Sequence, residues 1–305
     1  MQMVVEQKTP IVSVLMPTYN CEAYVDEAIQ SVLNQEFQDF ELLLLHKKSN
    51  DKSLEIIEKK IKSDLRARII DCSELNLSDT LNYGLTLAKG IYIARMDADD
   101  VSTKNRFNEQ IRCLEQNSLD ICGSHVLQIN ESGKLLDAKI MPLSPENIAI
   151  RLAYGVPFAH GSVLMRREFI HKNDLKYDSA GIAEDYSLWI KFFYRKAKMG
   201  NANEFLFKYR VLDSSASVRL GKENRLACKK LRKEYIKVNK NVLIEYLDRI
   251  GNQYINFNLD EKKYILILSI VGIKVFGYKN FYFFFKKSNA KVIALAISAL
   301  ILAMI

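Results

Sequence analysis

Two carboxylates stand two residues apart directly after an apolar stretch of this 305-residue chain. Asp97 and Asp99 follow the run IYIARM at residues 91–96. Because side chains two apart in an extended segment point the same way, both carboxylates would face one ligand. Mg²⁺ and Mn²⁺ take oxygen ligands, often one or two carboxylates completed by substrate phosphates. The pattern predicts a metal–phosphate site, with helix capping by Asp100 or Ser102 as the alternative.

A second candidate is the sequence Pro17-Thr18-Tyr19-Asn20, which closes the first apolar run and precedes a helical pattern. Backbone N–H groups at a helix start, a hydroxyl and an aromatic ring can together contact a nucleotide. The alternative is an ordinary strand-to-helix turn with Asn20 as the N-cap.

A third candidate is Glu184-Asp185, which opens the sequence EDYSLWIKF. Adjacent acids before an apolar periodic stretch are typical of a helix N-terminus, where the helix dipole favours them. They could equally provide a general base, because a neighbouring carboxylate raises the proton affinity of its partner. Tyr186 and Trp189 are expected in the core.

The three motifs can form one site only if strands and helices bring them together, and the sequence predicts such strands and helices. Four apolar runs separated by helical spacing are predicted as strands, at residues 11–16, 41–45, 68–71 and 91–96. Continuous apolar strands that alternate with helices indicate a parallel sheet covered on both faces. Right-handed crossovers place the C-terminal ends of such strands at one edge, where open α/β sheets bind ligands.

The later part of the chain follows a different pattern. A strand–turn–strand is predicted over residues 121–140, with Glu131-Ser132-Gly133-Lys134 as the turn. Helices are expected at residues 77–87, 103–117, 145–152 and 185–198, and most of the chain after Arg219 reads as helical.

Composition narrows the class of protein. With 49% hydrophobic and 26% charged residues, the chain is typical of a soluble globular protein rather than a disordered or fibrous one. The five cysteines are scattered and never form a CxxC pair, so neither a disulfide framework nor a zinc site is expected. Because the first 20 residues lack the apolar core of a secretory signal, we expect a cytoplasmic protein.

The net charge of +8 is concentrated near the C-terminus. Residues 219–291 hold 17 Lys and Arg against 6 Asp and Glu, a balance of +11 that leaves −3 for the rest. Such a segment would face an anionic partner, either nucleic acid or membrane lipid. It lacks a recognisable reading helix or single-strand platform, so we expect no nucleic acid.

Apolar segments in the same region favour a membrane surface. Residues 292–305 are uncharged but shorter than the roughly 20 residues of a spanning helix. With residues 264–273 and 281–285 they predict a monotopic anchor at the inner face of the cell membrane. The alternative is a helical subdomain in which these segments cover one another.

Five motifs in order resemble the family 2 glycosyltransferases with the GT-A fold, in particular bacterial members that build surface polysaccharides such as O-antigen. The resemblance covers about residues 10–217, and it is carried by PTYN, LSDTLNYGLTLAKGIYIARMDADD, FAHGSVLMRREF, EDYSLWIKF and YRVLDSSAS. It implies an α/β fold with a mostly parallel sheet flanked by helices over residues 1–218, followed by a helical basic extension over residues 219–305.

The resemblance also implies roles for individual residues. Pro17, Thr18 and Tyr19 would form the nucleotide-binding turn, and Asn76 would contact the base or phosphate. Asp97 would lie near the ribose, and Asp99 would hold Mn²⁺ or Mg²⁺ against the diphosphate of a nucleotide-sugar.

The remaining motifs concern the sugar acceptor. Asp185 would be the base of an inverting displacement on a hexosyl donor. His160 and Glu184 would lie on the acceptor side, where a saccharide or a polyprenyl-diphosphate-linked saccharide would bind. For His160 a purely structural role is the alternative.

Two departures from the family pattern affect recognition. The stretch His46-Lys47-Lys48-Ser49-Asn50-Asp51 stands where relatives have an acidic sequence that accepts a hydrogen bond from uracil. Lysine cannot accept such a bond, and neutral histidine could do so only through one ring nitrogen, although a backbone carbonyl could replace the lost acceptor. Leu212 stands where relatives often have a histidine, so a third metal ligand is either missing or supplied by Asp213.

Other functions are less compatible with the motifs. A nucleotidyltransferase would need a Gly-rich phosphate loop after the first strand, and a glycoside hydrolase would need neither a metal nor a nucleotide turn. The remaining alternative is a catalytically weak glycosyltransferase-like protein that binds nucleic acid or membrane.

Overall fold

The computed structural model describes residues 9–179, 182–212 and 221–253. The chain forms two compact units. The first comprises Met1–Pro145 and Val156–Ala227, and the second comprises Glu146–Gly155 and Cys228–Ile305. The boundary predicted between residues 218 and 219 stays a prediction. The apolar segments predicted to form an anchor, and Asp213, lie outside the described residues.

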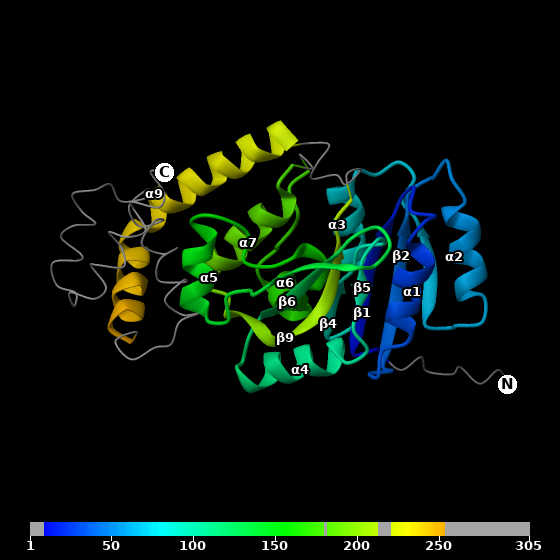
Figure 1. The fold of residues 1–305 in the computed structure, drawn as a ribbon, viewed down its shortest axis with the longest axis horizontal. Helices are drawn as coiled ribbons and strands as arrows, with labels where there is room; N and C mark the ends of the chain where they lie inside the picture. The colour runs from blue at the N-terminus through cyan, green and yellow to red at the C-terminus, as the bar shows by residue number, and fades with distance from the viewer. Residues whose placement is uncertain (1–8, 180–181, 213–220, 254–305) are drawn as a thin grey trace. The chain divides into compact units, whose positions relative to one another are not determined.

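The first unit contains a sheet of nine strands (Figure 1). They are β1 (Val12–Thr18), β2 (Phe40–His46), β3 (Ala67–Asp71), β4 (Tyr92–Arg95), β5 (Val101–Ser102), β6 (Ile121–Ile129), β7 (Leu135–Lys139), β8 (Leu164–Arg166) and β9 (Met199–Arg210). The helices described in the chain are α1 (Val25–Leu33), α2 (Ser53–Ile61), α3 (Leu77–Leu87), α4 (Arg106–Gln116), α5 (Pro145–Leu152), α6 (Arg167–Lys172), α7 (Glu184–Tyr194) and α9 (Gly221–Gln253), with a 3₁₀ turn at His160–Ser162.

The sheet joins a parallel half to a mixed half, in the order β3-β2-β1-β4-β8-β6-β9-β5, with β7 on β6. β3, β2, β1 and β4 are all parallel, so their C-terminal ends share one edge. β8 is antiparallel to both β4 and β6, and it reverses the strand direction in the middle of the sheet. The α/β fold class predicted from the sequence is confirmed, and the antiparallel strands are confined to the second half.

The core explains why the early strands are continuous apolar runs. Leu42–Leu45 of β2 are all fully buried, because helices cover both faces of the sheet. α1 buries Val25, Ala28, Ile29 and Val32, which lie on one side of a 3.6-residue helix. Gly90 precedes β4 where a Cβ atom would lie 2.5 Å from the Ser13 nitrogen, so only glycine lets the chain pass β1 so closely.

The second unit contains most of α5 and the larger part of α9. The Tyr235 hydroxyl donates to the Ala149 carbonyl at 2.9 Å and joins the two helices within this unit. α9 is kinked at Asn239, whose side chain donates to the Tyr235 carbonyl at 2.8 Å. Among the described helices none is long and apolar enough to span a membrane.

Candidate active site

The predicted nucleotide turn lies at the C-terminal end of β1. The Thr18 hydroxyl is buried and lies 3.0 Å from Nδ1 of His46, at the end of the neighbouring strand. Tyr19 is 45% exposed, and the Lys47 ammonium lies 5.5 Å from the centre of its ring. An aromatic ring and a cation are therefore presented together at the edge where the sheet would bind a nucleotide.

Reciprocal hydrogen bonds tie the loop after β1 to the loop after β2. The Asn20 N–H donates to the Ser49 hydroxyl at 3.0 Å, and the Asn50 N–H donates to the Asn20 side chain at 2.9 Å. Asn20 has a left-handed backbone (φ 46°), which asparagine tolerates well. It is not the N-cap of α1, which is Tyr24, so the capping alternative for this motif is wrong.

The stretch that departs from the family pattern begins at a buried histidine. Burial lowers the pKa of His46, which keeps the ring neutral at physiological pH. Since His46 is already hydrogen-bonded to Thr18 and lysine has no acceptor, an acidic partner for uracil is not restored here.

Asn76 is the N-cap of α3, where its side chain accepts from the Asp79 N–H at 3.0 Å. Its amide also donates to the Asp79 carboxylate at 2.6 Å. These two local bonds engage both the oxygen and the nitrogen of the Asn76 amide. The predicted contact of Asn76 with a base or phosphate stays a prediction.

The carboxylates of the Asp97 motif lie just beyond β4, beside a buried cation. Arg95, only 3% exposed, forms an ion pair with Asp97. Burial, and then the negative charge of Asp97, raise the pKa of Asp99 to about 6. Asp100 is buried and accepts from the Arg210 N–H at 2.7 Å, whereas α4 begins only at Arg106 after Asn105. The helix-capping alternative for this motif is therefore wrong.

The acidic pair Glu184 and Asp185 occupies the first turn of α7. Burial, and then the Glu184 charge, raise the pKa of Asp185 to about 6. The preceding Ala183 has a left-handed backbone (φ 53°), a strained conformation that often accompanies functional sites. The acids begin a helix, as the first interpretation of this motif predicts. The raised pKa of Asp185 is compatible with a general base, and that role stays a prediction.

Electrostatic coupling indicates that the two acidic motifs face one site. Besides burial, the Asp97 charge raises the pKa of Glu184, and the Arg95 guanidinium lowers the pKa values of both Glu184 and Asp185. The four residues come from segments some 90 positions apart in the sequence. The Arg95 charge also lowers the pKa of Asp99, so the acids expected from the sequence to bind a metal and to accept a proton lie around one buried cation.

His160 and Tyr177 form one wall of this site. His160 Nε2 lies 3.0 Å from the Tyr177 hydroxyl, and its ring contacts Trp189 edge-on at 6.0 Å. Burial and the nearby Arg95 charge hold the pKa of His160 well below its usual range, so the ring is neutral. Asn82 of α3 fixes the Tyr177 backbone through two hydrogen bonds, of 2.8 and 2.9 Å.

Four residues at the site, Arg95, Gly161, Tyr177 and Arg210, escaped the sequence analysis. Gly161, Tyr177 and Arg210 contact residues that are distant in the sequence, whereas Arg95 pairs with Asp97 two positions away. Arg95, Gly161 and Arg210 lie within the motifs quoted above, and that position was the one sequence feature that could have identified them as site residues. Tyr177 lies between two motifs, and no sequence pattern indicates its role.

The donor set at Asp97 and Asp99 suits a hard divalent cation. Burial and mutual repulsion disfavour the Asp99 anion, and a bound cation would stabilise it. In the part of the chain that the structure describes, no group of three or more acidic, histidine or cysteine side chains converges to hold a metal. A cation held by these residues would therefore need further oxygen ligands from the substrate, as Mg²⁺ commonly does.

Comparison with known proteins decides the family. Residues 13–174 match the family described as Glycosyl transferase family 2. The chain belongs to this family. The O-antigen biosynthesis glycosyltransferase WbnJ of Escherichia coli is 32% identical over 211 residues, which cover 67% of this chain and 81% of WbnJ. EpsE of Bacillus subtilis (strain 168), which bears a provisional glycosyltransferase name, is 35% identical over 212 residues, covering 68% of this chain and 75% of EpsE.

Solved structures of similar fold bind nucleotide ligands. TarS 1–349 from S. aureus in complex with UDP superimposes with a TM-score of 0.59 at 19% identity, over 85% of this glycosyltransferase and 79% of that chain. The mannosyltransferase PcManGT from Pyrobaculum calidifontis, in complex with GDP-Man and Mn²⁺, gives 0.56 at 12% identity, over 96% and 88%. At these identities the likeness shows the fold alone, and it confirms the predicted GT-A architecture.

Proposed function

We propose that this glycosyltransferase moves a hexosyl group from a nucleotide-sugar to a saccharide or polyprenyl-diphosphate-linked saccharide, with inversion, in surface-polysaccharide synthesis. The observation that carries the proposal is that one buried guanidinium, Arg95, pairs with Asp97 and acts electrostatically on both Asp99 and Asp185. The similarity to WbnJ supports the polysaccharide assignment.

Asp185 supplies the proton acceptor of this reaction. With its pKa raised to about 6, its carboxylate is mostly ionised at pH 7 yet basic enough to accept a proton in the transition state. The acceptor hydroxyl oxygen bonds to the anomeric carbon while the bond from that carbon to the diphosphate oxygen breaks. The proton goes to Asp185, and the nucleoside diphosphate leaves with the bonding electrons.

Asp99 would hold Mn²⁺ or Mg²⁺, and Asp97 would contact the ribose. A cation bound there would neutralise the charge that develops on the departing diphosphate. Arg95 fixes the orientation of Asp97 through their ion pair. His160, kept neutral, is available to hydrogen-bond an acceptor hydroxyl without adding charge.

The donor is proposed to be UDP-linked, through the turn at Pro17, Thr18 and Tyr19. The complex of TarS with UDP supports a uridine nucleotide, whereas that of PcManGT with GDP-Man shows that this fold also accepts guanosine. Lys47, beside the Tyr19 ring, can donate to a uracil carbonyl oxygen, while a backbone carbonyl would have to accept from the uracil N3–H.

A screen of nucleotide-sugars for Mn²⁺-dependent release of nucleoside diphosphate tests the proposal. Asp99→Ala should abolish the dependence on Mn²⁺, and Asp185→Asn should lower kcat about 10²–10⁴-fold. Asp137→Asn, an exposed acid on β7, is the matched control and should retain the wild-type rate. Nucleotide binding without turnover for any donor would instead favour the catalytically weak relative.

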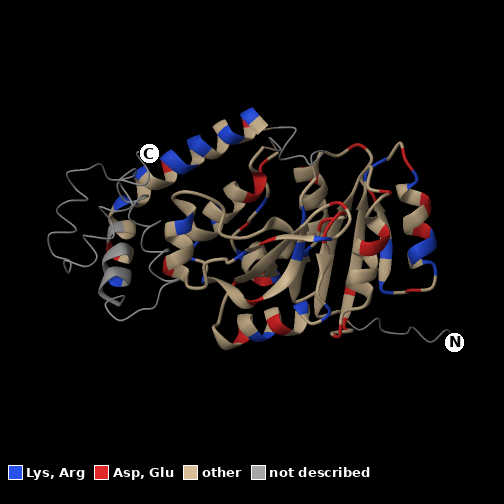
Figure 2. Cartoon of the chain, viewed as in Figure 1, with Lys and Arg blue, Asp and Glu red and all other residues tan. Residues whose placement is uncertain are grey.

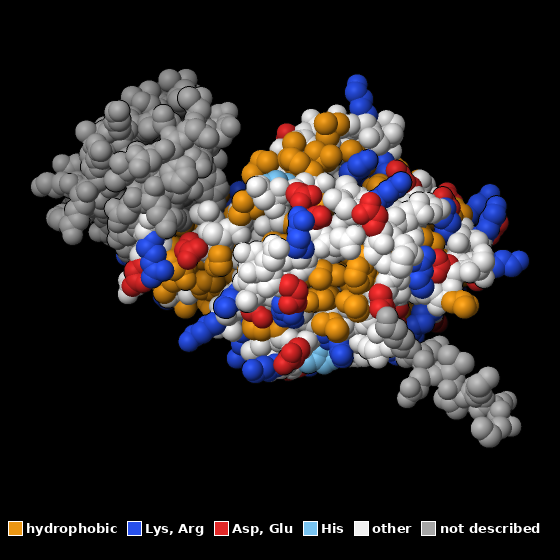
Figure 3. Space-filling model, turned by 90° about the horizontal axis from the view of Figure 1, so that it is seen from below, with side chains coloured by type: hydrophobic (Ala, Val, Ile, Leu, Met, Phe, Trp, Pro, Cys, Tyr) orange, Lys and Arg blue, Asp and Glu red, His pale blue; other side chains and the backbone are white. Residues whose placement is uncertain are grey.

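We also propose a peripheral location at the cytoplasmic face of the membrane, supported by the surface of α9. Six exposed basic residues fall on one side of this helix, namely Lys222, Arg225, Lys229, Lys230, Lys233 and Lys237. Figure 2 shows Lys and Arg positions recurring along the α9 ribbon, whereas acidic and basic side chains are interspersed on the face of the molecule seen in Figure 3. Clustered Lys and Arg favour anionic lipid by about 1 kcal/mol each near the surface.

Vesicle sedimentation tests this location. The full chain should bind anionic phosphatidylglycerol vesicles, but not phosphatidylcholine vesicles, and salt should release it. Lys229→Glu with Lys233→Glu should weaken binding, whereas Lys59→Glu with Lys62→Glu on and beside α2 should not. Equal loss in the two double variants would contradict a role for α9.

A further inference from the structure

Arg210 is the last residue of β9 and contacts the loop that carries Asp99. Its side chain is buried, with 2% of the residue exposed. Nε donates to the Asp99 carbonyl at 2.8 Å, and the backbone N–H donates to the Asp100 carboxylate at 2.7 Å. One residue therefore holds both the backbone of the predicted metal ligand and the side chain that follows it.

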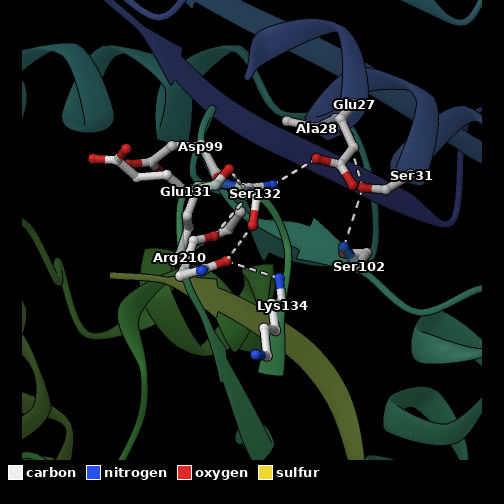
Figure 4. A network of polar contacts seen from close by, with 11 residues as sticks. Glu27, Ala28, Ser31, Asp99, Ser102, Glu131, Ser132, Lys134 and Arg210 are labelled. Carbon is white, nitrogen blue, oxygen red and sulfur yellow. Dashed lines mark hydrogen bonds and ion pairs between the residues drawn. The ribbon is translucent and has the colours of Figure 1, made fainter. Parts of the chain in front are cut away.

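The other guanidinium donors reach two further segments (Figure 4). Nη1 donates to the carbonyls of Asn130 and Glu131, at 3.2 and 2.8 Å, in the turn between β6 and β7. Nη2 pairs with Glu27 of α1 at 2.5 Å. The guanidinium thus connects three segments that are distant in the sequence, and most of its acceptors are backbone carbonyls whose positions it fixes.

Further hydrogen bonds order the two segments that Arg210 joins to the Asp99 loop, namely the turn between β6 and β7 and helix α1. The Asn130 side chain accepts from the Lys134 N–H at 2.8 Å and from the Ser132 hydroxyl at 2.9 Å, which closes the turn. On the other side of the Asp99 loop, the Ser102 N–H donates to the Ser31 hydroxyl of α1 at 3.1 Å. Hydrogen bonds within the turn thus order the carbonyls that Arg210 contacts, and the Ser31–Ser102 bond ties the chain after Asp99 to α1.

We propose that Arg210 is a positioning residue that fixes the Asp99 loop in the geometry that binds a divalent cation together with the nucleoside diphosphate. This inference rests on the proposed function. A planar, forked guanidinium can bond several acceptors in fixed directions, whereas a lysine ammonium cannot. Arg210→Lys should therefore keep the buried charge and lose the geometry.

Calorimetric titration of the full chain with UDP, and with GDP in parallel, separates positioning from general stability. Each nucleotide is measured with Mn²⁺ and with EDTA, and the ratio of the two affinities is the quantity of interest. For Arg210→Lys the Mn²⁺-dependent gain in affinity should fall about tenfold or more, because small misplacements of a binding group are costly. Affinity in EDTA should stay within about twofold, because the hydrogen-bond partners of Arg210 among the described residues do not include the Thr18 turn.

Two variants complete the test. Arg112→Lys replaces an exposed arginine of α4, 57% exposed at its side chain, and should leave both affinities unchanged. Glu27→Gln removes the charge of the carboxylate that pairs with Arg210 and should reduce the Mn²⁺-dependent gain in affinity about two- to fivefold. This variant tests the positioning role if Arg210→Lys does not fold.

Three results would overturn the inference. A parallel loss of affinity with Mn²⁺ and with EDTA would mean that Arg210 only stabilises the fold. An unchanged Mn²⁺-dependent gain in Arg210→Lys, or in Glu27→Gln should the first variant not fold, would refute the positioning role while the proposed function stands. Absence of any Mn²⁺-dependent gain in the wild-type protein would refute the proposed metal site together with the inference.

Discussion

Replacing Gly161 with alanine should damage donor binding through Asp97. A Cβ atom at Gly161 would lie 2.8 Å from Asp97 Oδ2 and 2.5 Å from Phe207 Cζ, whereas ordinary contacts begin at 3.4 Å. Phe207 is fully buried and Asp97 is held by Arg95, so neither neighbour can move away easily. Asp97 would need to shift by about 0.6 Å, and misplacements of this order cost roughly 10–100-fold in kcat/KM.

The same clash should lower the free energy of unfolding by about 1–3 kcal/mol, as overpacking usually does. We would measure steady-state donor kinetics and urea unfolding for Gly161→Ala beside Gly155→Ala. At Gly155 the nearest atom to a new Cβ is 3.5 Å away, so that control should match the wild type. Wild-type donor kinetics in Gly161→Ala would refute the placement of Asp97 against this turn.

Two further predictions follow from buried charges. Because the pKa of Asp185 is raised to about 6 and the base acts when deprotonated, kcat/KM should fall tenfold per pH unit below about pH 6 and level off above it, as a pH–rate profile would show. That limb should be absent from the residual rate of Asp185→Asn. Arg106→Met should lower the free energy of unfolding by about 3 kcal/mol in urea titration, because the buried guanidinium donates to the Arg95 and Val163 carbonyls and to Ser102. A loss below about 1 kcal/mol would contradict this account.

The parallel half of the fold follows from local sequence patterns. The runs predicted at residues 11–16 and 41–45 are β1 and β2 within one or two residues, and α3 has the predicted bounds. These elements are legible because burial on both faces demands continuous apolar residues. β9, at 12 residues the longest strand described, was missed because its sequence MGNANEFLFKYR mixes polar and apolar side chains without a clear period. The three-residue β8 is too short to leave any pattern.

The sequence indicated the acids, His160 and the Thr18 turn of the candidate site, but not the residues that hold them in place. Carboxylates two residues apart after an apolar strand carry their meaning locally, so Asp97 and Asp99 were found. Arg95 did not stand out because a lone arginine in a strand usually marks an exposed edge, whereas here the Asp97 carboxylate compensates its burial. Tyr177 is defined by His160 and Asn82, which lie 17 and 95 positions away in the chain.

The loop after β2 is hydrogen-bonded to the loop after β1 through residues that follow Lys47 and Lys48, the two side chains that would meet the nucleobase. Hydrogen bonds from Asn20, Cys21 and Glu22 engage residues 49, 51 and 53, and none of these tethers uses the side chains of Lys47 or Lys48. Exchanging those two lysines would therefore leave the backbone of the loop in place. If this loop meets the nucleobase as proposed, a small library at Lys47 and Lys48 should change nucleobase preference without changing the fold.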